Sequence, residues 1–165
     1  MNEVAETFWG KSDYSFKKGQ RRNVMTHYVD QYFKNQSQWI PWNQWHNHDP
    51  GACPGVYVVG YHETNHEDAT CQRVVYIGEA HDGNLGSRLY FFEHEAKGIG
   101  GPHLGGRKFC EKGWQIMDAW VRMYPTGGGE LGILNGGALA QLIERELIWE
   151  FCQNNDGKLP ELNAR

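Results

Sequence analysis

The sequence lacks several features that would each point to a class of protein. It has no apolar run approaching the ~20 residues that are needed to span a bilayer. Its four cysteines, Cys53, Cys71, Cys110 and Cys152, include no CxxC pair, which argues against a zinc ribbon and against a disulfide-stabilised scaffold. The first residues, MNEVAETFWGKSD, are polar and acidic, unlike a signal peptide. These absences predict a cytoplasmic protein with reduced thiols and no membrane association.

An excess of positive charge is also missing. The 16 Lys and Arg residues are outnumbered by 20 Asp and Glu residues, which gives a formal net charge of −4. Proteins that bind nucleic acid over a large surface are usually basic overall, so this balance counts against such a role. A local basic patch can still serve a small footprint, and basic residues do cluster in the segments 17–22 and 107–112.

The residues that are present fit one domain with an aromatic-rich extension. The length of 165 residues suits a single core, and 13% of the residues are aromatic. Residues 1–50 are rich in Trp, Tyr, Gln, Asn and His and are interpreted as an extension packed on or beside a domain at 51–165. Within it, Trp39, Trp42 and Trp45 could stack on bases, but we expect them to pack in the core.

The pattern of apolar residues and turns predicts an α+β fold, with helices flanking a small three-stranded antiparallel sheet. The expected elements are strands at Gly55–Tyr61 and Arg73–Glu79, a helix at Leu85–Lys97 closed by Gly98, a glycine-rich loop at Gly98–Gly106, a strand within Trp114–Tyr124 and a helix at Ala138–Phe151.

The last of these helices carries a carboxylate on its apolar side. At 100° per residue its apolar residues fall within an arc of ~140°, the stripe that a packed helix buries. Glu144 lies inside this arc, whereas Glu146 and Glu150 lie on the other side. A carboxylate that faces a core is costly unless it is paired or binds a metal. Glu144 is therefore either a functional carboxylate or a residue at the edge of the stripe that reaches solvent or an arginine.

The first two strands contain a mirror-image pattern, Gly55-Val56-Tyr57 and Tyr76-Ile77-Gly78. If antiparallel pairing sets Tyr57 opposite Tyr76, then Gly55 lies opposite Gly78. The two phenols would share a face beside a patch without side chains, which could admit a phosphate closely. Gly55 and Gly78 are therefore expected to bind substrate, although a single tyrosine is more often a packing residue.

Together these residues resemble the GIY-YIG nuclease superfamily, which includes a component of the repair excinuclease, homing endonucleases and some restriction enzymes. The similarity covers roughly residues 53–163 and consists of five motifs in order: Gly55-Val56-Tyr57, Tyr76-Ile77-Gly78, Arg88, Glu144 in LIERELI, and Asn163 in LPELN. Two departures from the family pattern are the 18 residues between the tyrosines and the lack of a histidine four residues after the arginine, where Phe92 stands.

The resemblance implies a metal-dependent endonuclease that hydrolyses double-stranded DNA by a single-metal mechanism. Glu144 would bind one divalent cation, Mg²⁺ (or Mn²⁺), with water and substrate oxygens completing its shell. Arg88 would bind the phosphate and stabilise the charge of the transition state. Tyr57 would be the general base, Tyr76 would hydrogen-bond the phosphate or the attacking water, and Asn163 would tie the tail to the active-site wall.

Other residues are candidates for the same site. His94 and His103 are nearby in the sequence and could each replace the family's histidine. The segment Gly98–Lys108 combines glycines with His103, Arg107 and Lys108, so it could bind a phosphate or simply form a flexible loop. Arg107 and Lys108 are therefore also expected to bind substrate.

Two other functions and several biological roles stay open. The chain could be a nucleic-acid-binding module that has lost cleavage, as its acidic charge suggests. His62, Glu63 and His66 spell HExxH, a zinc-peptidase signature, but that motif needs a helix and here it follows a strand in a polar segment. A restriction enzyme would be expected to form a homodimer, for which the aromatic extension could supply the interface. Repair, homing, phage defence and interbacterial toxicity are the other biological roles that the sequence leaves open.

Overall fold

The computed structural model describes residues 38–48, 53–61, 73–127 and 132–163 of the chain. Four strands form one antiparallel sheet in the order β1-β4-β2-β3. They are β1 (Ile40–Pro41), β2 (Gly55–Tyr61), β3 (Arg73–Ala80) and β4 (Ala119–Pro125). The α+β class expected from the sequence is confirmed, and the sheet has one strand more than the three that were predicted.

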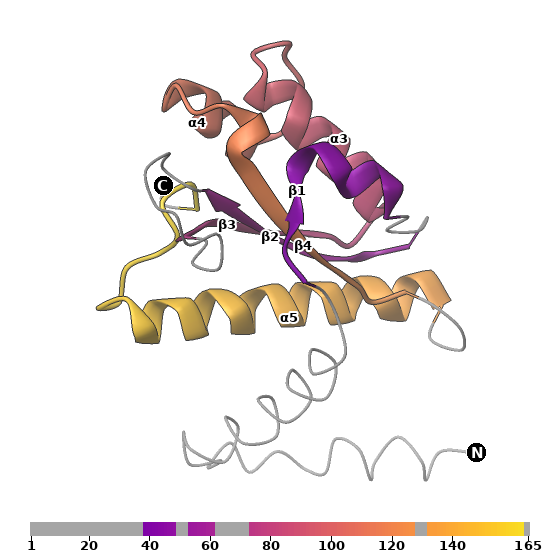
Figure 1. Ribbon diagram of the computed structural model, residues 1–165. Coiled ribbons are helices and arrows are strands. Elements are labelled where there is room, and N and C mark those ends of the chain that lie inside the picture. Colours follow the sequence, from indigo (N-terminus) through magenta and orange to yellow (C-terminus); the bar gives the residue numbers. More distant parts are fainter. Residues whose placement is uncertain (1–37, 49–52, 62–72, 128–131, 164–165) are drawn as a thin grey trace, which may run out of the picture.

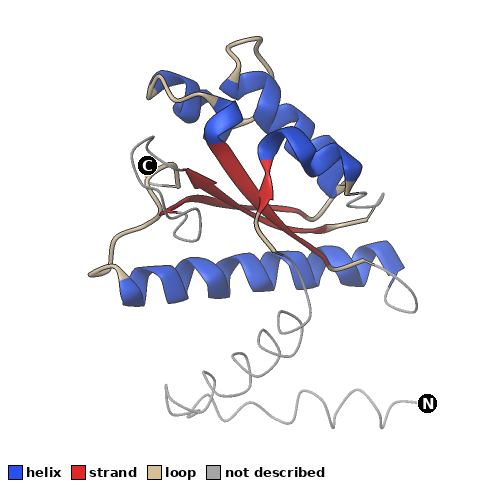
Figure 2. Ribbon diagram, viewed as in Figure 1, coloured by secondary structure: helices blue, strands red, loops and turns tan. Residues whose placement is uncertain are grey.

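Helices cover both faces of this sheet (Figure 1). The α-helices are α3 (Leu85–Ala96), α4 (Leu104–Glu111) and α5 (Gly132–Asn154), and the 3₁₀ helices are η1 (Trp42–Asn47) and η2 (Ile116–Asp118). Figure 2 shows α5 running along one face, with α3, α4 and η1 on the other. The molecule therefore has three layers, and the sheet is the middle one.

Each face of the sheet has its own hydrophobic cluster. The larger cluster lies under α3, α4 and η1 and includes Tyr57, Val59 and Phe92. The smaller one lies against α5 and includes Val56 and Val58. All seven residues of β2 are buried, because this strand pairs with a neighbour on both edges and is covered on both faces. Its continuous apolar run, GVYVVGY, is the pattern of such a central strand.

The predicted register between β2 and β3 is wrong by two residues. Tyr57 pairs with Gly78 rather than Tyr76, and Tyr76 pairs with Val59. An even shift leaves the same side chains on the same face, so the two tyrosines still share one side of the sheet. The register then changes beyond Val59, where an irregularity of the bulge type inserts an extra residue into β3.

Helix α3 begins and ends where local sequence signals predict. Asn84 caps its N-terminus by accepting the Ser87 N–H at 2.7 Å. After its last turn, Gly98 adopts φ of 72°, a left-handed conformation that favours glycine. This helix follows β3 after a short turn, so its first turns stay close to the strand that carries Tyr76.

Two expectations about the glycine-rich segments are wrong. The predicted loop Gly98–Gly106 ends early, because α4 begins at Leu104 and its first turns contain Gly105 and Gly106. Helix α5 begins at Gly132, six residues before the predicted start.

The strand expected within Trp114–Tyr124 is preceded by η2 and occupies Ala119–Pro125.

The described part of the N-terminal extension is built into the core. Its strand β1 pairs with β4, and the next two tryptophans of the WIPWNQW segment, Trp42 and Trp45, are 1% and 4% exposed. The expectation of core packing is confirmed for these two, and Trp39 is partly buried against the smaller cluster on the α5 face. None of the described helices combines the length and the apolar character that crossing a membrane needs.

Candidate active site

The two tyrosines lie side by side between the sheet and helices α3 and α4. Their ring centroids are 5.9 Å apart. Tyr57 is fully buried and Tyr76 is partly buried. Burial raises the pKa of the Tyr57 phenol well above its ordinary value, with a further rise from Tyr76, while the Arg88 guanidinium opposes the change. Burial also raises the pKa of Tyr76, again opposed by Arg88. Both phenols are therefore neutral near pH 7 in this state.

Glycines on two elements make room for these rings. A Cβ atom on Gly78 would lie 2.6 Å from Cε1 of Tyr76 and 2.8 Å from the hydroxyl oxygen of Tyr57. A Cβ on Gly105 would lie 2.7 Å from the other edge of the Tyr76 ring. These contacts explain why the register differs from the predicted one. Each tyrosine lies opposite a smaller residue, Tyr57 opposite Gly78 and Tyr76 opposite Val59, which leaves room for both rings.

Gly55 does not provide the opening that the mirror pattern suggested. A Cβ on this residue would lie 2.5 Å from Cδ1 of Leu85 and 2.6 Å from the carbonyl oxygen of Tyr124. The space is filled by protein, so Gly55 allows α3 to approach the sheet. Of the two glycines expected to bind substrate, only Gly78 lies against the tyrosines.

His103 joins the tyrosines from the start of α4. It is 1% exposed, and its Nε2 lies 2.5 Å from the hydroxyl oxygen of Tyr57. Its Nδ1 accepts the Gly106 N–H at 3.2 Å and so caps the helix. Burial and the nearby Arg88 cation lower the pKa of His103 to about 3. The imidazole is therefore neutral at physiological pH.

Arg88 is the common neighbour of the ionisable groups in this region. It comes from the first turn of α3, and its positive charge influences the pKa values of both tyrosines, of His103 and of Glu144. Its Nε atom is buried and has no hydrogen-bond partner in the described structure. A guanidinium group with an unused donor, beside two phenols, is suited to bind an anion such as a phosphate.

Glu144 approaches the same region from the opposite face of the sheet. It lies on the side of α5 that packs against the strands, with Ala140 and Ile143 buried beside it, as the apolar stripe predicts. Burial raises the pKa of its carboxyl to about 7, and the carboxylate of Glu79 adds to the rise, whereas Arg145, Arg88 and His81 oppose it. Its charge also raises the pKa of Tyr76, so the two groups interact across the sheet.

The surroundings of Glu144 act against its ionised form. Glu144 makes no hydrogen bond or salt bridge to a described residue. The ionised carboxyl is disfavoured by burial and by Glu79, and a bound cation would relieve both effects. No group of three or more His, Cys, Asp or Glu side chains suited to a metal occurs in the described ranges. A cation here would thus need water and substrate oxygens, as Mg²⁺ commonly does.

The two candidate histidines have different positions. His94 lies six residues after Arg88, about 120° away around α3 by helix geometry, and its ring packs against the exposed Tyr90 at 4.0 Å. His103, by contrast, contacts Tyr57 directly. Phe92, four residues after Arg88, packs beside this contact with its ring centroid 5.0 Å from that of His103.

The basic residues of the Gly98–Lys108 segment make structural contacts. Arg107 donates to the Glu95 carboxylate at 3.1 Å and to the carbonyl of Gly101 at 3.4 Å. Lys108 donates to the carbonyl of Leu162 at 3.3 Å. These bonds join α4 to α3 and to the C-terminal segment, so in this state neither charge is directed at the tyrosines.

Asn163 connects the C-terminal segment to the sheet. Its side chain accepts the backbone N–H of Ile77 and donates to the carbonyl of the same residue, so it ties the C-terminal segment to β3 between Tyr76 and Gly78.

Sequence reasoning missed three contributors to the site. Gly105 leaves room for the Tyr76 ring. The sequence feature that could have indicated this role is the pair Gly105-Gly106, which was expected to be part of a loop. Glu79 adds negative charge near Glu144, and His81 hydrogen-bonds Glu79 with Nδ1 2.8 Å from Oε1. Both closely follow the YIG motif in the sequence, which is the only signal that could have indicated them.

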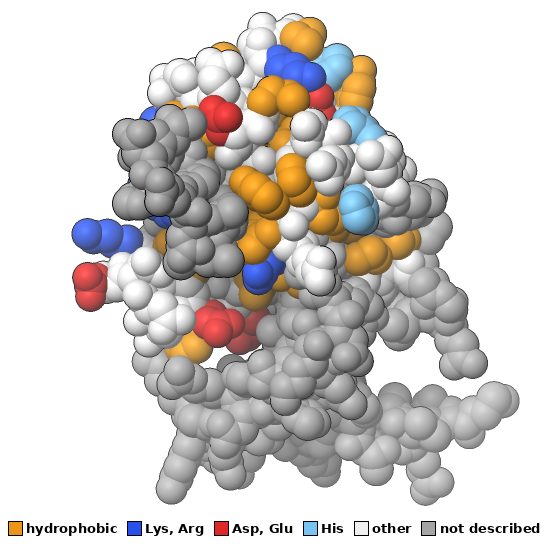
Figure 3. Space-filling view, in the orientation of Figure 1, with side chains coloured by type: hydrophobic (Ala, Val, Ile, Leu, Met, Phe, Trp, Pro, Cys, Tyr) orange, Lys and Arg blue, Asp and Glu red, His pale blue; other side chains and the backbone are white. Residues whose placement is uncertain are grey.

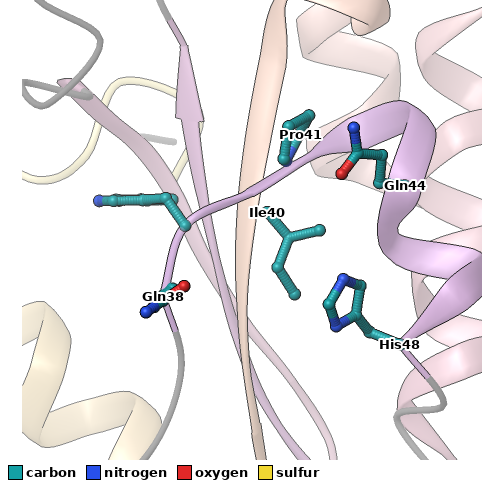
Figure 4. A pocket seen from close by; sticks show the side chains of 6 residues that line it. Gln38, Ile40, Pro41, Gln44 and His48 are labelled. Carbon is teal, nitrogen blue, oxygen red and sulfur yellow. The ribbon is translucent and has the colours of Figure 1, made fainter.

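A surface hollow of about 470 Å³ lies apart from this cluster, along β1 and η1 (Figure 4). Ile40 and Pro41 from β1 and Gln44 and His48 from η1 and its end line it, and none of the candidate site residues does. The HExxH motif at residues 62–66 lies outside the described residues.

Comparison with known proteins gives no functional assignment, so the proposal below depends on the geometry of the site. No protein-family model matches the chain, and neither a curated protein nor a solved structure matches it.

Proposed function

We propose that the protein is a metal-dependent endonuclease that hydrolyses DNA phosphodiester bonds at the cluster of Tyr57, Tyr76, Arg88 and Glu144. The observation that carries this proposal is that the rings of Tyr57 and Tyr76 lie 5.9 Å apart beside Arg88, whose buried Nε has no hydrogen-bond partner among the described residues. The Arg88 charge acts on both phenols and on the Glu144 carboxyl, although these groups come from two strands and from a helix on the other face of the sheet. The charge of Arg88 thus lowers the pKa values of groups as far apart in the sequence as Tyr57 and Glu144.

Three side chains of the cluster would act on the substrate or on the attacking water. Arg88 binds the phosphate and stabilises the charge that develops on its oxygens. Tyr57, in its ionised form, takes a proton from the attacking water as the oxygen of that water bonds to phosphorus. The bond from phosphorus to the leaving sugar oxygen breaks, and that oxygen takes a proton from solvent. Tyr76 orients the phosphate or the water through its hydroxyl group.

Glu144 would hold the divalent cation, with Mg²⁺ or Mn²⁺ the cations suited to a single protein carboxylate. When bound, such a cation supplies Lewis-acid stabilisation to a phosphoryl oxygen. Burial raises the pKa of Tyr57 well above its ordinary value, so the ionised phenol would need positive charge nearby. The general-base role therefore depends on cations near Tyr57 in the substrate complex.

The charge distribution is compatible with a small footprint on DNA. Residues 85–112 carry five Lys or Arg and three Glu residues, a formal charge of +2, in a chain whose total is −4. On the face seen in Figure 3, acidic and basic side chains are scattered singly among uncharged ones. The layer formed by α3 and α4 thus carries a net positive charge in a chain that is acidic as a whole, and we place the phosphate backbone there.

The test is cleavage of plasmid DNA in the presence of Mg²⁺. Wild-type protein should nick or linearise the plasmid, and Glu144→Gln should abolish cleavage. Glu150→Gln is the matched control, because it removes the same charge from an exposed position of the same helix. Intact plasmid combined with a mobility shift would refute the nuclease and favour a DNA-binding module without catalysis, the alternative that the acidic net charge motivates.

A further inference from the structure

The neighbours of His103 determine where its proton lies. Nδ1 accepts the backbone N–H of Gly106 at 3.2 Å, and a ring nitrogen that accepts a hydrogen bond carries no proton. A neutral imidazole has one N–H, which must then be on Nε2. This nitrogen is 2.5 Å from the hydroxyl oxygen of Tyr57. Nε2–H is therefore the donor, and the Tyr57 oxygen is the acceptor.

The opposite arrangement conflicts with the helix cap. A Tyr57 hydroxyl that donated to Nε2 would require the proton on Nδ1, where it would face the N–H of Gly106. Two donors would then meet at a buried helix terminus, and the Gly106 N–H would lose its partner. A doubly protonated ring would create the same conflict and would add a cation beside Arg88.

We infer that His103 is a positioning residue that donates a hydrogen bond to the Tyr57 oxygen, stabilises its ionised form, and does not act as a base. The inference rests on the proposed function in one respect, namely that Tyr57 accepts a proton from water. Throughout the reaction that proton moves from the water to Tyr57, while the Nε2 proton of His103 stays in place. Tyr57 is prepared for the next cycle when its proton is released to solvent.

Three groups face the Tyr57 oxygen, each from a different element. Arg88 on α3 supplies a positive charge that favours the phenolate, Tyr76 on β3 supplies a neutral hydroxyl, and His103 at the start of α4 supplies the N–H. The low pKa of His103, about 3, means that the ring stays neutral, with the same tautomer, across the pH range in which a nuclease would work. The donor is therefore always present.

The first experiment tests the tautomer without any need for activity. The ¹⁵N chemical shifts of histidine ring nitrogens distinguish a protonated from an unprotonated atom. The range from about pH 5 to about pH 9 brackets the ordinary histidine pKa of about 6.5. Throughout this range, the His103 ring of wild-type protein should show a protonated Nε2 and an unprotonated Nδ1. A protonated Nδ1, or an imidazolium at the acid end, would overturn the inference.

The second experiment separates the two hydrogen bonds. An Asn side-chain oxygen can replace Nδ1, so His103→Asn keeps the cap and loses the donor to Tyr57. A Gln side-chain amide can replace Nε2–H, so His103→Gln keeps the donor and loses the cap. Losing a hydrogen bond to a charged group corresponds to about a ten- to hundred-fold lower rate, so H103N should slow cleavage by that factor. The acid limb of its pH–rate profile should move about one to two units higher.

His103→Gln should recover most of the rate lost in H103N and should restore the acid limb to its wild-type position. A purely structural histidine predicts the reverse order, because the cap is what H103Q lacks. Equal defects in both variants, or a wild-type rate and pH profile in H103N, would refute the donor role, provided that both proteins unfold cooperatively. If wild-type protein cleaves no DNA, the proposed function fails, and the ¹⁵N result still decides the tautomer.

Discussion

The side chain of Asn163 pairs with both backbone groups of Ile77 on β3. Its Oδ1 accepts the N–H of Ile77 at 2.9 Å, and its Nδ2 donates to the carbonyl at 2.7 Å. Since β3 is the last strand in the order β1-β4-β2-β3, this edge has no neighbouring strand among the described residues. One amide side chain thus takes the place of a strand beside the residue that separates Tyr76 from Gly78.

Replacing Asn163 should therefore weaken both the fold and the site. Asn163→Ala removes two hydrogen bonds, and we expect a loss of about 1–3 kcal/mol in the free energy of unfolding. Hydrogen exchange of the Ile77 amide should accelerate more than exchange in β2. Asn155→Ala is the control, because the Asn155 side chain donates one local hydrogen bond, to the carbonyl of Phe151 one turn earlier. Equal effects of the two substitutions would show that the Asn163 pair has no special importance.

The two glycines at the start of α4 should respond differently to alanine. A Cβ on Gly105 meets the Tyr76 ring, which can tilt, whereas a Cβ on Gly106 would lie 2.4 Å from the Phe92 carbonyl oxygen, which cannot move without α3. Alanine also favours the helix by ~1 kcal/mol, which partly offsets either clash.

We expect Gly106→Ala to lower the free energy of unfolding by about 1–3 kcal/mol in urea titrations, as overpacking does. Gly105→Ala should change stability less and should lower the cleavage rate at least about tenfold, because it displaces Tyr76. Increased stability of G106A, or full activity of G105A, would contradict these contacts.

Glu144 should couple cation binding to pH. Its carboxyl has a pKa of about 7, raised by burial and then by Glu79, so a cation must displace a proton below that pH. Mg²⁺ should raise the thermal midpoint of wild-type protein more at pH 8 than at pH 6, values set roughly one unit on either side of that pKa. EDTA should reverse the increase, and Glu144→Gln should remove it while Glu150→Gln retains it. An Mg²⁺ effect that persists in E144Q would place the cation elsewhere.

His103 should make the protein less stable in acid. In the unfolded chain its pKa is near the ordinary value of about 6.5, whereas burial and then Arg88 lower it to about 3 in the folded protein. Between these values the unfolded state binds more protons, so the free energy of unfolding decreases as the pH falls, by up to about 1.4 kcal/mol per unit.

This contribution is fully present above about pH 6.5 and is lost progressively toward pH 3. Urea unfolding measured at several pH values should show a shallower dependence for H103N and H103Q than for wild-type protein, since both variants lack the ring. Identical slopes in all three proteins would mean that the imidazole is not neutral in the fold.

Element boundaries could be predicted from the sequence where they depend on residues close together in the chain. The apolar run GVYVVGY, the start of the helix at Leu85 and the left-handed Gly98 each predicted a boundary that the structure confirms. The position of Glu144 on the buried side of α5 also followed from helical periodicity alone. The site predictions that depended on pairing between strands did less well, because a G-x-Y/Y-x-G pattern looks the same at two registers that differ by an even shift.

The errors in the helices have one physical cause. Glycine disfavours helices, so the segments around Gly105 and Gly136 were expected to be irregular. In the structure these glycines lie where backbones approach closely: a Cβ on Gly136 would lie 2.7 Å from the Gly127 Cα, and one on Gly137 would lie 2.3 Å from the His81 carbonyl oxygen. Contacts between distant segments outweigh the local preference, and a single sequence does not reveal such contacts.

The carboxylate of Glu93 connects helix α3 to residues that precede the segment 53–163. Its Oε2 accepts the indole N–H of Trp42 at 3.1 Å and that of Trp45 at 3.2 Å, and Lys97 pairs with its other oxygen. Helix α3, which carries Arg88, is thereby held by residues that precede it by about 50 positions. A fragment that begins at residue 51 would lose β1 and two core tryptophans and would leave Glu93 without these donors. The smallest autonomous unit of this protein therefore starts no later than Ile40, and β1 and η1 of the aromatic extension are part of the scaffold that supports the proposed active site.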